Sequence, residues 1–162
     1  MVLTAFTVFH VILSLVGIGS GLVVLYGLLT SRWFERWTIV FLTTTVATSV
    51  TGFLFPVHKF LPSHAVGVLS LILLAIAISA RYAFHLAGVW RRTYVVTATL
   101  ALYLNSFVLV AQLFQKVPPL KALAPTQSES PFKIAQLVVL VIFAVAGARA
   151  AIKFRENPLR TT

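Results

Sequence analysis

Four histidines, His10, His58, His64 and His85, are the side chains in this sequence best suited to hold a cofactor or a metal. His10 lies inside a long apolar run and His64 at the start of another, whereas His58 falls in a short segment between two prolines. Two neutral imidazoles from different helices can ligate a haem iron, and helical bundles build such sites from facing side chains. We therefore expect His10 and His64 to be the pair that would bind a b-type haem.

Two glutamines add hydrogen-bonding groups at a similar depth. Gln112 lies near the end of the fourth apolar run and Gln136 near the start of the fifth, in the half of the protein that holds His10 and His64. A quinone or another small lipophilic molecule would use these residues as hydrogen-bond partners between apolar walls. A zinc or copper ion at His58 and His64 is a further alternative, although their spacing does not place both on one helix face.

Residues that the sequence lacks exclude several chemistries. Without cysteine there is no disulfide, thiol nucleophile or thiolate metal site. The three acids, Glu35, Glu129 and Glu156, lie outside the apolar runs, which argues against a carboxylate-based pump or ion carrier. No Ser-His-Asp arrangement, P-loop or HExxH motif is present. We expect a non-catalytic protein, and any enzymatic activity would be that of a membrane oxidoreductase.

The elements that must position these residues are long apolar segments. The chain has 162 residues, of which 59% are hydrophobic and 10% are charged, whereas a soluble domain has about 25% charged residues. A membrane-spanning helix needs about 20 apolar residues. The sequence therefore predicts an all-α integral membrane protein, a single domain over residues 1–162 that forms a compact bundle of about five transmembrane helices. The expected spans are residues 3–29, 37–55, 63–87, 93–114 and 132–151, with a proline-rich loop at 115–131 and a tail at 152–162.

Four spans, with one shorter segment lying in the membrane interface, is the alternative.

With five spans, most basic residues fall on the side of the C-terminus. That side receives Arg32, Arg36, Arg81, Arg91, Arg92, Arg149, Lys153, Arg155 and Arg160, and the other receives Lys59, Lys116, Lys121 and Lys133. Short loops rich in Lys and Arg resist translocation, so we expect a cytoplasmic C-terminus and an outer N-terminus. Basic residues at the ends of apolar runs fit a lipid bilayer as partner and argue against nucleic acid.

Small residues predict close helix packing. Gly17 and Gly21 share one face of the first span, and the second span is dense in Thr and Ser over residues 43–52. Such residues pack helices against one another within a protein or with a partner, so a homo-oligomer or a larger membrane complex is expected. Alternatively, Gly17, Gly19 and Gly21, with Gly67 just after His64, would let a planar ring approach the backbone.

Residues 52–64 and 122–132 resemble stretches of small uncharacterised bacterial multi-pass membrane proteins. This resemblance implies a bacterial cytoplasmic (inner) membrane location and brings no activity with it. The histidine-bearing apolar helices with a basic turn resemble the haem-bearing helices of cytochrome b561-type membrane proteins, which implies a b-type haem.

The leading functional hypothesis is a multi-pass inner-membrane protein that acts as a non-catalytic scaffold, accessory subunit or small-ligand-binding protein. The alternative is an electron-transfer protein that binds haem b or quinone through His10 and His64, with Gln112 or Gln136 as hydrogen-bond partner. A small transporter or channel comes third, because no charged group marks a path through the apolar spans.

Overall fold

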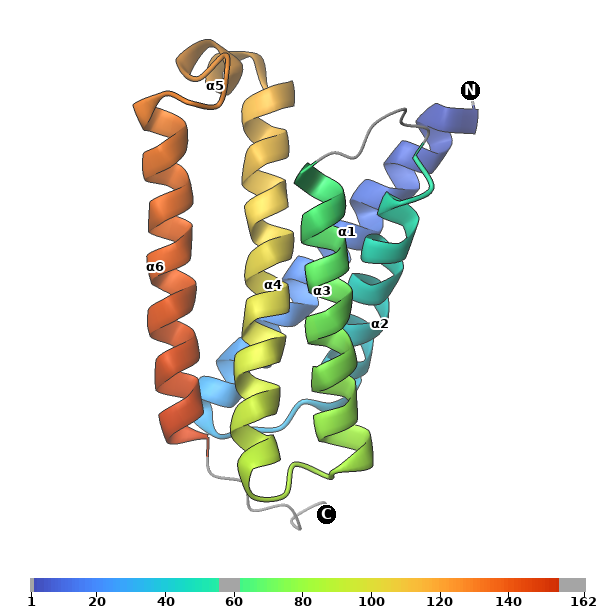
Figure 1. The fold of residues 1–162 in the computed structure, drawn as a ribbon, viewed down its shortest axis with the longest axis vertical. Coiled ribbons are helices and arrows are strands. Elements are labelled where there is room, and N and C mark those ends of the chain that lie inside the picture. The colour runs from blue at the N-terminus through green and yellow to red at the C-terminus, as the bar shows by residue number, and fades with distance from the viewer. Residues whose placement is uncertain (1, 56–61, 155–162) are drawn as a thin grey trace.

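The computed structural model is a bundle of long helices and describes residues 2–55 and 62–154 (Figure 1). Helix makes up 86% of the structure, and no strand occurs in the described residues, so the predicted all-α fold is confirmed. The helices are α1 (Val2–Thr30), α2 (Glu35–Gly52), α3 (Pro62–Ile78), the π-helical turn η1 (Ser79–Ala83), α4 (Val89–Lys116), α5 (Pro118–Leu123) and α6 (Ser130–Lys153).

Four of these helices are long and apolar enough to cross a membrane. They are the segments Thr4–Thr30, Ser63–Ala83, Val89–Lys116 and Ser130–Lys153. The second helix, α2, is not among them, because it begins with Glu35 and Arg36 and carries a run of hydroxyl side chains. Large apolar side chains point outward from the bundle, among them Ile12, Tyr26 and Ile142, each more than half exposed. This surface is compatible with a multi-pass membrane protein.

The long helices run alternately up and down, so the connections gather at two ends of the bundle (Figure 1). We call the basic end the one that holds residues 31–34, residues 84–88 and Phe154. The proline end is the one that holds the start of α1, the start of α3 and the short helix α5. Because neighbouring helices alternate in direction, His10 and His64 both belong to the proline half, as the sequence predicts.

The turn between α3 and α4 differs from the prediction. The helix ends at Ala83 rather than at residue 87, after the π-helical turn in which Phe84 N–H donates to Ser79 O at 3.0 Å. His85, Leu86 and Gly88 then take positive φ angles of 47°, 57° and 54°. No helix continues through left-handed residues, so α4 begins at Val89, ahead of the predicted residue 93.

The proline-rich loop is more ordered than a plain connector. It contains the one-and-a-half-turn helix α5, and Gln127 fixes the segment that follows to the end of α4. Gln127 Nε2 donates to Ala111 O at 2.8 Å, and Gln115 Nε2 donates to Gln127 Oε1 at 3.2 Å. The loop therefore lies over the ends of α4 and α6 (Figure 1).

The apolar core occupies mainly the basic half of the bundle. Its buried side chains come from all the long helices, and α6 adds Phe143 and the fully buried Ala150. The largest of them with almost no exposure are Leu28, Phe41, Leu74, Tyr94, Val95 and Leu102. The proline half has few such residues, and this asymmetry leaves space there for a cavity.

Candidate functional site

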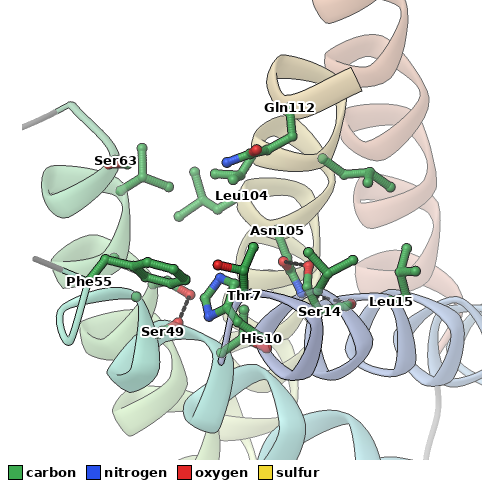
Figure 2. Close-up of a pocket in the computed structure, with 18 of the residues that line it drawn as sticks. Thr7, His10, Ser14, Leu15, Ser49, Phe55, Ser63, Leu104, Asn105 and Gln112 are labelled. Atoms are coloured by element: carbon green, nitrogen blue, oxygen red, sulfur yellow. Dashed lines mark hydrogen bonds between the residues drawn. The ribbon is translucent and has the colours of Figure 1, made fainter. Parts of the chain in front are cut away.

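A cavity of about 560 Å³ lies between α1, α2, α3 and α4 in the proline half. This volume falls within the range of about 300–1,000 Å³ that is usual for small-molecule sites. Figure 2 shows His10, Thr7, Ser14 and Asn105 along one side of it, with Gln112 further along α4. Apolar side chains, among them Leu104, Val108 and Leu109 of α4, make up most of the remaining wall, and Lys116 lies at its proline end.

The cavity exists because α1 crosses the bundle at an angle. At Gly21 the helix is in tight contact with α2 and α4: an added Cβ would lie 2.5 Å from Leu102 Cδ1 and 2.9 Å from the Phe41 ring. Glycine permits this approach because it has no Cβ. At the proline end α1 lies beside α2 and away from α4 (Figure 1). The opening between α1 and α4 is the space that the cavity fills.

The floor of the cavity is a hydrogen bond between α1 and α4. Ser14 Oγ donates to Asn105 Oδ1 at 2.9 Å, and the Asn105 side chain is buried. Near it, an added Cβ at Gly17 would lie 3.1 Å from Thr45 Oγ1. A polar pair in an apolar environment is stable only when its groups bond one another. This pair therefore fixes where the two helices meet, and the Ser14 and Asn105 side chains satisfy each other.

His10 lines the cavity from α1 and is held by α2. Its Nδ1 lies 2.9 Å from Thr51 Oγ1, and its ring meets Phe55 edge-on at a centroid distance of 5.2 Å. Thr51 Oγ1 also lies 2.7 Å from Ala47 O. If the hydroxyl donates there, Thr51 Oγ1 accepts from His10 Nδ1, which then carries the proton of the neutral ring. Nε2 of the neutral ring then keeps its lone pair as a ligand or a hydrogen-bond acceptor.

His64 lines the same cavity from the first turn of α3. Its ring stacks on Phe53 at a centroid distance of 5.6 Å with an interplanar angle of 24°. Phe53 in turn covers Gly67, where an added Cβ would lie 3.0 Å from the ring. The two histidines thus share one cavity, and each is packed against a different aromatic residue at the end of α2.

Of the two glutamines predicted for the site, the structure places one at the cavity and one elsewhere. Gln112 lines the cavity, but Gln136 does not. Gln136 is buried between α6 and α4, where its Nε2 donates to Phe107 O at 3.1 Å. It ties two helices together on the other side of α4. His58 lies outside the described residues.

Three of the four glycines considered for a bound ring are instead in close contact with side chains of the protein. Gly17 and Gly21 face side chains of α2 and α4, Gly67 faces the Phe53 ring, and Gly19 has no neighbour within 4 Å. Within residues 2–55 and 62–154, no group of three or more His, Asp or Glu side chains is placed to hold a metal ion. The cavity offers at most paired imidazoles as ligands.

A second polar cluster, at the basic end, was not predicted as a unit. Arg81 forms an ion pair with Glu35, and its guanidinium lies 4.1 Å from the Trp33 ring centroid. Trp33 Nε1 also donates to Glu35 Oε2 at 2.7 Å. The hydrogen bond from Arg81, and then that from Trp33, hold the pKa of the Glu35 carboxyl below its usual value. This cluster ties the link between α1 and α2 to η1.

Sequence reasoning missed the residues that complete the cavity. Thr51, which orients His10, is one of many hydroxyl residues in α2, and nothing in its spacing distinguishes it. Lys116 is read as an ordinary interfacial cation from its place after an apolar run. Ser14 and Asn105 could have been paired only with knowledge of where α1 crosses α4. Comparison with protein-family models, with curated proteins and with solved structures finds no match to this chain.

Proposed function

We propose that this protein is a membrane-embedded, non-catalytic binding protein for a small lipophilic molecule, with the cavity between α1 and α4 as its site. The observation that carries the proposal is the cavity itself, which joins apolar walls such as Leu104 and Leu109 to a few polar side chains such as His10 and Gln112. Apolar walls with a small number of placed hydrogen-bonding groups are typical of small-molecule sites.

The proposal includes five membrane spans, with α2 as the fifth. Helix α2 starts at the basic end and finishes at the proline end, as a spanning helix would (Figure 1). Glu35 and Arg36, at its start, lie at the membrane surface in this proposal, and the 16 residues from Trp37 to Gly52 give a length of about 24 Å at 1.5 Å per residue, somewhat less than the roughly 30 Å hydrocarbon core. Its hydroxyls bond back to the helix, as in Thr44 to Val40 O at 2.7 Å and Thr48 to Thr44 O at 2.8 Å. These bonds lower the cost of placing hydroxyls in lipid.

The proposed orientation puts the basic end in the cytoplasm of a bacterium and the cavity in the outer half of its inner membrane. The support is the excess of Arg and Lys at the basic end, which resists translocation. The absence of cysteine makes the test simple. Two variants each carry a single cysteine, Thr126→Cys near the proline end and Ser31→Cys at the basic end. An impermeant maleimide should label them from opposite sides of the membrane. Labelling of both from one side would overturn the topology.

The ligand is tested by extraction. Protein purified in mild detergent is extracted with organic solvent, and the released molecules are identified by mass spectrometry. Val108→Trp fills the cavity from α4, and Val96→Trp is the matched control because Val96 is 44% exposed on the same helix. The proposal expects a molecule recovered at near-equal amounts from the wild type and Val96→Trp and lost from Val108→Trp. Equal recovery from all three, or none from any, contradicts it.

A second candidate, an electron carrier with haem b or quinone, is favoured by one observation. His10 and His64 line one cavity, and a hydrogen bond donated by His10 Nδ1 to Thr51 would leave the His10 Nε2 lone pair available. Hydrogen bonding of the second ring nitrogen orients many metal-ligating histidines in this way. The visible spectrum of protein from haem-replete cells shows whether the protein binds haem. A Soret band that His10→Ala and His64→Ala each abolish supports it, and a colourless wild type rejects it.

A further inference from the structure

The distribution of charge and polarity along the cavity identifies the class of ligand. We propose that the ligand is an amphiphile with an anionic head group and an apolar chain, its head at Lys116 and its chain directed toward Asn105. This inference rests on the proposed binding function and adds to it the chemical class of the molecule and the direction in which it lies.

Among the described residues that line the cavity, Lys116 is the one with a permanently charged side chain, and none of them carries a carboxylate. In the part of the chain that the structure describes, the one ion pair is between Glu35 and Arg81 at the opposite end. Glu129, the acid of the proline loop, accepts hydrogen bonds from Thr126 and from the Ser128 backbone. The Lys116 ammonium therefore has no described carboxylate partner, and an anionic group at the cavity would supply one.

The end of the cavity that holds Lys116 offers polar groups from two helices. Gln112 and Lys116 are four residues apart on α4, so their side chains share one face of that helix. Ser63 and His64, at the start of α3, lie at the same proline end. Together these residues offer an ammonium and several hydrogen-bond donors, the set that binds a carboxylate or a phosphate.

Deeper in the cavity, α1 and α4 present apolar side chains. The hydroxyl groups that α2 and α3 present there already have partners within the protein, since Ser49 donates to Ser70 Oγ at 3.2 Å and Thr48 donates to Thr44 O at 2.8 Å. Val11 and Leu15 of α1 and Leu104 and Val108 of α4 line it between the mouth and the floor. From Lys116 to Asn105 the helical rise gives a depth of about 16 Å. At the floor, Asn105 Oδ1 already accepts from Ser14, so a polar head gains little there. This arrangement suits a molecule with one charged end and a chain, whereas a neutral quinone would leave the charge of Lys116 uncompensated.

The test compares an anion with its neutral analogue. A long-chain fatty acid and the primary alcohol of equal length are titrated into delipidated protein in non-ionic detergent, at a pH where the acid is ionised. Variants are Lys116→Gln and the matched control Lys121→Gln, an exposed lysine of the same end that does not line the cavity. Charge-assisted hydrogen bonds and partly exposed ion pairs are worth about a fivefold to tenfold change in affinity.

We expect Lys116→Gln to weaken binding of the acid by this factor and to leave that of the alcohol unchanged, while Lys121→Gln changes neither. If acid and alcohol bind equally and Lys116→Gln has no effect, the inference is overturned and the binding function stands. If neither molecule binds, or Val108→Trp binds both as well as the wild type, the binding function itself fails.

A free fatty acid and an anionic phospholipid share this chemistry, and competition separates them. The fatty acid is titrated into nanodiscs of phosphatidylcholine alone and of phosphatidylcholine with phosphatidylglycerol. If the fatty acid binds more weakly to the nanodiscs that contain phosphatidylglycerol, and Lys116→Gln removes this difference, the phospholipid head group is the occupant. Equal binding in both, still sensitive to Lys116→Gln, identifies the free acid. Insensitivity to Lys116→Gln in both nanodiscs counts against the inference.

Discussion

A methyl group at Gly21 should force α1 away from the rest of the bundle. The added Cβ would lie 2.5 Å from Leu102 Cδ1 and 2.9 Å from two atoms of the Phe41 ring, whereas carbon atoms pack best at about 3.5–4.0 Å. Leu102 and Phe41 are each only 1% exposed, so neither side chain has free space into which to move. Overpacking of this kind costs about 1–3 kcal/mol.

Gly19→Ala is the matched control, because an added Cβ there meets nothing within 4 Å. Both substitutions gain the same helix propensity, about 1 kcal/mol, so the difference between them isolates the packing cost. The assay is thermal unfolding in detergent, where a domain of this size shifts its Tm by about 2–4 °C for each kcal/mol. Gly21→Ala should unfold several degrees below Gly19→Ala. Equal Tm values would refute the close crossing of α1 on which the cavity depends.

Three further predictions concern single contacts. The lowered pKa of Glu35 means that its ion pair with Arg81 contributes fully at neutral pH and is lost as the pH falls below about 4.5, the ordinary value. Since the Glu35 side chain is 52% exposed, the contribution is below about 1 kcal/mol. Wild-type Tm should therefore fall slightly more than that of Glu35→Gln between pH 7 and 3, and parallel curves would contradict this. Gly88→Ala should destabilise by about 1–2 kcal/mol, because Gly88 has φ 54°; chemical unfolding measures it, and an unchanged midpoint would argue against that backbone conformation. Asn105→Leu removes the acceptor for Ser14 Oγ and should cost about 0.6–1 kcal/mol, measured as a Tm decrease that Ser14→Ala does not add to. Additive losses would mean that the two residues act separately.

The level of each site residue along the bundle could be predicted from the sequence. Apolar runs fix where helices lie, and the alternation of helix direction then fixes which half holds each residue. For this reason His10, His64 and Gln112 were expected in one half, and they line one cavity there. Gln136 lies in the same half but faces Phe107. Counting residues gives depth and says nothing of which side of a neighbouring helix a residue faces.

The crossing of α1 could be predicted only in part. Gly17 and Gly21 indicate a close approach, but the sequence does not identify the partner side chains, which come from both α2 and α4. The angle of α1 decides that the proline half opens into a cavity. That angle depends on the packing of many side chains at once, among them Leu28 and Tyr94 in the core.

The turn after α3 lay beyond prediction for a local reason. His85 and Leu86 adopt positive φ angles, which are uncommon for residues other than glycine. The buried Leu86 side chain belongs to the core, and this burial favours a conformation that local preferences disfavour. The hydrogen bond from Leu86 N–H to Ala80 O at 2.9 Å also holds the turn.

Protection of a cavity cysteine is the most direct test of the claim that a lipophilic molecule occupies the space between α1 and α4. Since the natural chain has no cysteine, Val108→Cys can be alkylated alone, with Thr126→Cys in the proline loop as the exposed control. Delipidated protein should react at both positions. Reloading with the molecule recovered by extraction should slow alkylation of Val108→Cys strongly and leave Thr126→Cys unchanged. Alkylation of Val108→Cys at the same rate with and without that molecule would contradict the account.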